Sequence, residues 1–223
     1  MIPWQELGRA RAPDGGELVL RQRGGDYEIR VDGFDLMSNR AHGSEEELAR
    51  LACAHVTAAE APRVLVGGLG MGYTLRATLD VLPPGAQVVV AEIVPAVVEW
   101  NRGPLAPLAG CPLDDPRSAV HVGDVGALLR TTTVRFDAIM LDVDNGPQSL
   151  VRKGNQLLYS PVGLQTTKNA LRRGGMLAVW SSDRSSTFET RLRKAGFAAR
   201  SVDVPARGKA GGPKHTIFLA QAA

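Results

Sequence analysis

The stretch "VLVGGLGMGYTLRA", Val64 to Ala77, decides the fold class of this chain. Apolar residues lead into a glycine-rich turn, and residues with helical spacing follow directly. The glycines form GxGxG. They do not form the GxGxxG of dinucleotide-binding turns, because Tyr73 occupies the position of the last glycine in that motif. A glycine turn between a strand and a helix lets the backbone approach a nucleotide closely. The stretch therefore predicts a nucleotide site at the carboxyl end of a strand.

Downstream of this turn, strand-like and helix-like segments alternate. The expected strands are "RVLVGG", "AQVVVAEI", "AVHVGD", "FDAIMLDVD" and "MLAVWSS", and the expected helices are "YTLRATLDVL", "PAVVEWNR", "VGALLRT", "SPVGLQTTKNALRRGG" and "STFETRLRKAGF". The last two strands, "ARSVDV" and "HTIFLAQ", read as an antiparallel pair. Such alternation predicts an α/β, Rossmann-like fold with a mostly parallel sheet of about seven strands.

Upstream of the turn, the sequence pattern changes from alternating strands and helices to short strands. "ELVLRQR", "YEIRVDG" and "FDLMS" read as short strands joined by turns. Ser44 followed by Glu47 has the spacing of a helix capping box. We therefore expect an N-terminal β-strand segment over 1–43, acting as a lid or a dimer contact, and a nucleotide-binding domain over 44–223.

Composition narrows the functional class. The chain has 223 residues, 44% of them hydrophobic, and a net charge of +3. No apolar run approaches the ~20 residues of a membrane span, and the N-terminus lacks the apolar core of a secretion signal. Two cysteines and four histidines without metal-ligand spacing predict neither disulfides nor a metal site. We expect a cytoplasmic protein without a membrane or nucleic-acid partner, and interpret the basic "PARGKAGGPKH" as a solvated hairpin loop.

Acidic residues follow the expected strands at their carboxyl ends, where ligands bind in such sheets. Glu92 lies 20 positions after Gly72 and could accept hydrogen bonds from both hydroxyls of a ribose; it could also be an acid at a helix N-terminus. Asp124 could bind the amino group of adenine, with Val125 against the ring, or cap the next helix.

The fourth strand is followed by "DVDNGP". Asp142 is the best candidate for orienting an amine nucleophile and accepting its proton. Asp144 could bind a second cationic group of the acceptor. Asp144 and Asn145 could instead form a turn before Gly146 and Pro147.

Five segments together resemble the spermidine synthase (polyamine aminopropyltransferase) family, which has the class I S-adenosylmethionine methyltransferase fold. They are "VLVGGLGMGYTLR", "VVVAEIVPAVVEWNR", "HVGDVGALL", "FDAIMLDVD" and "LLYSPVGLQTTKNALRRGGMLAVW", and the resemblance covers about Tyr27 to Phe197. It implies that Glu92 binds ribose, that Asp124 binds adenine and that Asp142 helps to deprotonate the attacking amine. It also implies S-adenosylmethionine or its decarboxylated form as cofactor, an amine as acceptor and a homodimer.

The sequence departs from the family pattern around the acceptor. Met71 stands where the family has an aspartate that pairs with the aminopropyl ammonium, and a thioether cannot neutralise an ammonium. A tyrosine–glutamine pair of the family aligns with Ser44 and Glu45, and the second family acid after the fourth strand falls at Asn145. The loss of the acid at Met71 slightly favours intact S-adenosylmethionine, and hence methyl transfer to an amine-type small molecule. Aminopropyl transfer, another use of the sulfonium and a non-catalytic S-adenosylmethionine binder remain as alternatives.

The expected site residues are the catalytic Asp142 and Asp144; the cofactor-binding Gly68, Gly70, Met71, Gly72, Glu92, Ile93, Gly123, Asp124, Val125 and Asp142; and the substrate-binding His42, Glu45, Asn145 and Tyr159.

Overall fold

The computed structural model describes residues 2–13, 15–143 and 155–223. Its strands are β1 (Gln5–Arg11), β2 (Glu17–Arg23), β3 (Asp26–Val31), β4 (Phe34–Ser38), β5 (Arg63–Gly67), β6 (Gln87–Glu92), β7 (Ser118–Val122), β8 (Phe136–Leu141), β9 (Leu171–Ser181), β10 (Phe197–Pro205) and β11 (Lys214–Ala222). Its α-helices are α1 (Gly43–Cys53), α2 (Tyr73–Val81), α3 (Pro95–Arg102), α4 (Val125–Thr131), α5 (Asn155–Leu158), α6 (Pro161–Ala170) and α7 (Ser186–Lys194). Three 3-10 helices are η1 (Ala106–Ala109), η2 (Pro112–Asp114) and η3 (Gly208–Ala210).

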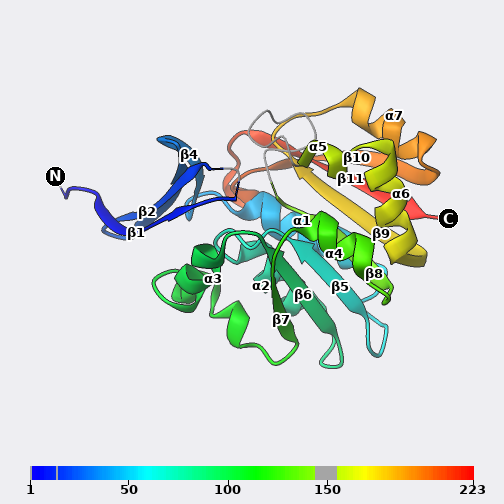
Figure 1. Ribbon diagram of the computed structural model, residues 1–223, viewed down its shortest axis with the longest axis horizontal. Coiled ribbons are helices and arrows are strands. Elements are labelled where there is room, and N and C mark those ends of the chain that lie inside the picture. The colour runs from blue at the N-terminus through cyan, green and yellow to red at the C-terminus, as the bar shows by residue number, and fades with distance from the viewer. Residues whose placement is uncertain (1, 14, 144–154) are drawn as a thin grey trace.

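The larger sheet has seven strands in the order β10-β11-β9-β8-β5-β6-β7 (Figure 1). The strands from β7 to β9 pair in parallel, and β11 pairs antiparallel with both β9 and β10. The α/β, Rossmann-like fold predicted from the sequence is therefore confirmed. The chain runs outward from β5 to β7 and returns to β8 beside β5, so the strand order reverses between β5 and β8. In such sheets ligands bind outside the carboxyl ends of the strands at this reversal.

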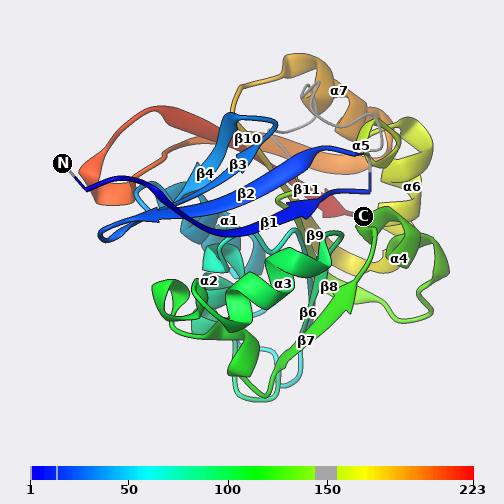
Figure 2. The ribbon, with the colours of Figure 1, turned by 60° about the vertical axis from the view of Figure 1, so that its left-hand side comes forward.

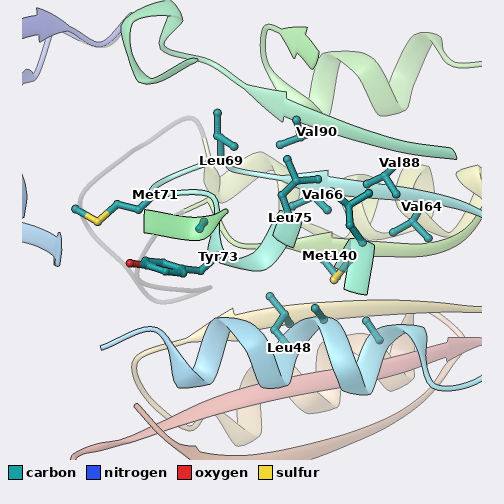
Figure 3. Close-up of a cluster of buried hydrophobic side chains, with 14 of the residues drawn as sticks. Leu48, Val64, Val66, Leu69, Met71, Tyr73, Leu75, Val88, Val90 and Met140 are labelled. Atoms are coloured by element: carbon teal, nitrogen blue, oxygen red, sulfur yellow. The ribbon is translucent and has the colours of Figure 1, made fainter. Parts of the chain in front are cut away.

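Helices cover both faces of the large sheet because its central strands are apolar on both faces. Val64 and Val66 of β5 face a core cluster shared with α1, α2 and α3. Leu65 between them faces the opposite cluster, which includes side chains of α4, α6 and α7. Figure 3 shows Leu48 of α1 facing the first cluster. Among the described residues, no helix combines the length and apolar character that crossing a bilayer requires.

The N-terminal strands form a separate antiparallel sheet in the order β1-β2-β3-β4, which lies beside the large sheet (Figures 1 and 2). Leu20 and Ile29 of this sheet are buried in the same core cluster as α1, α2 and α3. The sequence did not predict β1, which packs on α3. A Cβ at Gly8 of β1 would lie 2.4 Å from Trp100 Nε1, so the close approach of strand and indole depends on glycine.

The predicted capping box at the start of α1 is wrong. The helix begins at Gly43, His42 is its N-cap residue, and no side chain caps it. Ser44 lies inside the first turn and is fully buried. Glu47 bonds instead with Arg50 one turn later. The spacing of Ser44 and Glu47 matched the capping motif, but the Ser44 hydroxyl takes part in tertiary contacts and does not cap the helix.

The helix predicted over "SPVGLQTTKNALRRGG" is shorter than expected. Ser160 caps α6 as predicted, accepting a hydrogen bond from the Gly163 N–H at 3.1 Å. The helix ends at Ala170, and β9 begins at Leu171. Leu171 pairs with Phe136 of β8, and the register shifts before the next pair. Sheet pairing thus overrides the helical propensity of these residues.

Candidate functional site

A cavity of about 400 Å³ lies at the carboxyl ends of β5, β6, β7 and β8. This volume is within the range of small-molecule sites. The N-terminal sheet and its β1–β2 loop form one wall, with the apolar side chains Pro13, Leu18, Ile29, Val31, Leu36 and Met37. The large sheet provides the glycine turn and several acidic side chains opposite this wall.

The glycine turn follows β5 and forms part of the cavity. Gly68, Gly70 and Gly72 have φ values of +93°, +52° and +86°. A Cβ at Gly68 would lie 2.1 Å from the Asp142 carbonyl oxygen, and a Cβ at Gly70 would lie 2.9 Å from Met37 Sδ. The first glycine therefore permits close contact between β5 and the end of β8. The second lets β4 close over the turn.

Met71 follows in the turn and is fully buried, and it also lines the cavity. Figure 3 shows it with Tyr73 at one end of the cluster of apolar side chains. Burial raises the pKa of Tyr73 to about 12, so this phenol is neutral at physiological pH. The thioether and the neutral ring together add apolar and polarisable surface to the site.

Glu92 ends β6, and this residue is only 8% exposed. The Leu69 N–H donates to Oε2 at 3.0 Å, and the Val94 N–H donates to Oε1 at 2.8 Å. The carboxylate thus ties the glycine turn to the start of α3 and still lines the cavity, next to Ile93. Its predicted binding of ribose is compatible with these contacts because each carboxylate oxygen has a second lone pair.

Asp124 lies after β7 and caps α4, since its Oδ1 accepts from the Ala127 N–H at 2.7 Å. The capping alternative is therefore correct. Gly123, Asp124 and Val125 also line the cavity. Binding of adenine by Asp124 stays a prediction, and the second oxygen of the carboxylate remains compatible with it.

Asp142 and Glu45 bring two carboxyl groups together in the cavity. Asp142 follows β8, and its Oδ2 accepts from Thr74 Oγ1 at 2.7 Å. Burial raises the pKa of Asp142 to about 6, against the effect of the Thr74 hydrogen bond. Burial, and next the negative charge of Asp142, raise the pKa of Glu45 to about 7. Both acids therefore titrate close to neutral pH, and the charge of Asp142 disfavours the ionisation of Glu45.

We predict that Glu45→Gln raises the melting temperature at pH 8 but not at pH 4. The folded chain binds a proton at Glu45 more tightly than the unfolded chain, so its stability falls as pH rises from about 4 through about 7. The neutral amide removes this penalty of about 3 kcal/mol, which corresponds to a rise of about 6–12 °C. Thermal unfolding monitored by circular dichroism at both pH values measures it.

Glu47→Gln is the control in the same helix, because Glu47 bonds with Arg50 near the surface. It removes an ion pair and should give no increase at pH 8. An equal effect of Glu45→Gln at pH 4 and pH 8 would contradict the assignment of a raised pKa.

The other predicted substrate residues lie apart from the described cavity lining. His42 stacks on Tyr73 with ring centroids 4.1 Å apart, and its Nδ1 lies 2.7 Å from Glu46 Oε1. Tyr159 is 2% exposed and packs edge-on against Phe188. The structure thus places His42 behind the cavity and Tyr159 in the core, and their predicted roles remain untested.

Asp144 and Asn145 lie outside the described residues. Among the residues that are described, no cluster of His, Cys, Asp and Glu could bind a metal ion. The sequence did not predict a place in the site for Thr74, Trp180 or Met37. Thr74 lies two residues after Gly72 at the start of α2. This closeness to the glycine turn is the one sequence feature that could have identified it as a site residue.

Comparison with known protein families gives one domain match. The spermine/spermidine synthase domain matches residues 42–191. The polyamine aminopropyltransferase of Mycobacterium tuberculosis (strain ATCC 25618 / H37Rv) is 30% identical over 205 residues, which are 86% of this chain and 37% of that protein. The polyamine aminopropyltransferase of Korarchaeum cryptofilum (strain OPF8) is 27% identical over 119 residues, 53% of this chain and 35% of that protein. The chain thus spans about 37% of the length of its mycobacterial relative.

Solved structures show the same fold. Spermidine synthase from Thermotoga maritima superposes with a TM-score of 0.74 at 18% identity, covering 98% of this chain and 73% of that one. A spermidine synthase in complex with the transition-state analogue AdoDATO gives a TM-score of 0.73 at 17% identity, with the same coverage of both chains. A putative O-methyltransferase from Klebsiella pneumoniae is less similar, with a TM-score of 0.55 at 20% identity over 82% of this chain and 80% of that one.

Proposed function

Because the chain belongs to the spermine/spermidine synthase family, we propose that it transfers an aminopropyl group from decarboxylated S-adenosylmethionine to a small amine. The thioether at Met71, in place of the family's acid, slightly favours methyl transfer. The family match favours the alternative, aminopropyl transfer, since the relatives named above are aminopropyltransferases.

One observation carries this proposal: among the described residues, the charged side chains lining the cavity are all acidic. They are Glu45, Glu92, Asp124 and Asp142. Intact S-adenosylmethionine has a carboxylate, which these acids would repel. The decarboxylated donor has lost that group and keeps two positive charges, so the acidic lining complements its charge. The amine acceptor is also a cation before it reacts.

The chain's residues suit this donor. The glycine turn leaves space that a Cβ would fill, Glu92 lines the cavity beside this turn and is assigned to the ribose, and the apolar wall gives methylene groups a surface to pack on. When bound, the donor supplies an aminopropyl carbon that is already attached to a good leaving group, the sulfonium sulfur. Catalysis then requires a neutral amine aligned with that carbon–sulfur bond.

We assign Asp142 to orient the acceptor ammonium and to accept its proton. Thr74 fixes the position of the Asp142 carboxylate, and the raised pKa makes that carboxylate a stronger base than a solvated aspartate. The freed nitrogen lone pair forms the new nitrogen–carbon bond as the carbon–sulfur bond breaks. We assign Glu45, whose pKa is raised by the charge of Asp142, as a second holder of this proton.

The proposal predicts that decarboxylated S-adenosylmethionine binds at least about tenfold more tightly than the intact form. Isothermal titration calorimetry with both donors measures this preference. Incubation with an amine should then release 5′-methylthioadenosine, and not S-adenosylhomocysteine. Glu92→Gln should weaken both donors alike, which controls for the shared nucleoside.

Preference for the intact donor, with release of S-adenosylhomocysteine, would restore the methyl-transfer alternative. Binding of neither donor would overturn the transferase proposal.

The homodimer implied by the sequence belongs to this same proposal, and analytical ultracentrifugation of the chain tests it.

A further inference from the structure

The Ser44 hydroxyl, buried inside α1, contacts three polar groups, two of which come from distant parts of the chain. It lies 2.5 Å from Glu45 Oε2, and Trp180 Nε1 donates to it at 3.0 Å. His215 Nδ1 lies 2.9 Å from the same oxygen. Trp180 lines the cavity from the end of β9. His215 on β11 packs edge-on against its indole, with the ring centroids 4.6 Å apart. We call Ser44, Glu45, Trp180 and His215 the Ser44 cluster.

Hydrogen-bond chemistry couples the members of the cluster. The indole of Trp180 can only donate, so it uses one lone pair of the hydroxyl. One lone pair and one hydrogen then remain for Glu45 and His215. When Glu45 is ionised, it can only accept, so the hydroxyl donates to Glu45 and His215 Nδ1 must be the protonated ring nitrogen. When Glu45 gains a proton and donates to Ser44, the hydroxyl hydrogen must turn to His215 Nδ1, which accepts it.

With its proton on Oε2, the oxygen that faces Ser44, Glu45 leaves the cluster fully bonded only if His215 can change its tautomer. A buried hydroxyl hydrogen without an acceptor costs about 1–3 kcal/mol. Without His215, a proton on Glu45 Oε2 would leave the Ser44 hydrogen in that position. The ionised form would leave only a spare lone pair, which costs less.

Other ionisable groups lie around the Ser44 cluster. Asp142, after β8, and Glu46, in α1, both raise the pKa of Glu45. Burial lowers the pKa of His215, against the charge of Asp183. The remaining ionisable groups on elements packed against α1 include Tyr73 on α2, Asp203 on β10, which accepts from Thr216 Oγ1, and Lys209 on η3.

We propose that His215 is a positioning residue which, through Ser44, allows Glu45 to hold the proton released by the amine substrate. The inference rests on the proposed function for the source of that proton. The ammonium loses one proton to the Asp142–Glu45 pair, the neutral nitrogen displaces the sulfonium, and the proton resides on Glu45 while the Ser44 hydrogen turns to His215. Release of that proton to water restores the starting pattern.

The test measures the pKa of Glu45 directly in the full chain without ligand. A chain carrying glutamate labelled with ¹³C at the side-chain carboxyl is titrated by NMR, and Glu45→Gln identifies the resonance. We expect His215→Leu to lower the titration midpoint by about one pH unit, because the protonated form loses its acceptor. His215→Asn should keep the midpoint within about 0.3 units, since its amide can present either a donor or an acceptor at the Nδ1 position.

A double-mutant cycle separates this role from a structural one. Ser44→Ala removes the link, so adding His215→Leu to it should move the midpoint no further. In the kinetic assay, His215→Leu should shift the acidic limb of kcat/KM to lower pH and lower the plateau about three- to tenfold, because the base is weaker.

An unchanged Glu45 midpoint in His215→Leu, or equal shifts in the presence and absence of Ser44, would overturn the proposal. A change in melting temperature alone would show a packing role for His215. Because the NMR titration needs no activity, its result stands apart from the donor-binding test. Absence of aminopropyl transfer by the unmodified chain would remove the substrate as the source of the proton and leave the coupling of Ser44, Glu45 and His215 measurable.

Discussion

Asp142→Asn is expected to lower kcat/KM by about 10²–10⁴-fold, with little change in donor binding. An amide is isosteric with the carboxylate and can still accept from Thr74 Oγ1. It cannot accept a proton from the acceptor ammonium at any working pH. The attacking nitrogen would then remain protonated and without a lone pair for the new bond.

Steady-state kinetics from pH 6 to pH 9, with calorimetry for the donor, measures the two effects separately. The variant should regain part of its rate at high pH, where more of the free amine is already neutral. Asp80→Asn is the matched control, because Asp80 lies in α2 with its side chain 61% exposed and pairs with Arg76. If Asp142→Asn kept its rate within about threefold, Asp142 would not be the proton acceptor, and a binding protein would fit better.

Gly68→Ala is expected to be the most destabilising of the glycine substitutions in the turn. Its φ of +93° disfavours any side chain, and the added Cβ would lie 2.1 Å from the carbonyl oxygen of Asp142. That oxygen belongs to the backbone and cannot move without displacing the end of β8. We expect a loss of roughly 3 kcal/mol or more, which lowers the melting temperature by about 6–12 °C.

Gly15→Ala separates steric conflict from backbone strain, since Gly15 has the same φ of +93° and nothing within 4 Å of its added Cβ. It should cost only about 1–2 kcal/mol. Thermal and urea unfolding of both variants give the comparison. Equal losses would mean that the contact between Gly68 and Asp142 contributes nothing beyond the φ strain.

The sequence predicted that the glycine turn and the acids after the strands lie at one edge of the sheet, because their positions depend on order along the chain. Glu92 and Asp124 each follow a strand, and parallel strands bring their carboxyl ends to one edge. Glycine at 68 and 70 could be recognised from spacing alone. The partners of these glycines could not, since Met37 comes from another sheet.

Contacts between distant residues explain what the sequence could not show. Ser44 matched a capping motif, but its hydroxyl bonds with groups 136 and 171 positions away, Trp180 and His215. No local pattern encodes such a cluster. Similarly, β1 has a weak alternation of apolar residues, and it forms because Gly8 lets it approach Trp100. The pairing of Leu171 with β8 likewise shortened a helix that propensity alone would have extended.

The apolar wall of the cavity and three of its acidic groups come from different sheets, each with its own ladder of backbone hydrogen bonds, and the fourth acid, Glu45, lies on α1. Leu18, Val31 and Leu36 can therefore change in size without disturbing the strand pairing that positions Asp142. Under the proposed function, we expect selectivity for the shape of a bound molecule and the chemistry performed on it to be encoded in separate stretches of the gene. Substitutions in the first stretch would then alter the selectivity and leave the chemistry unchanged.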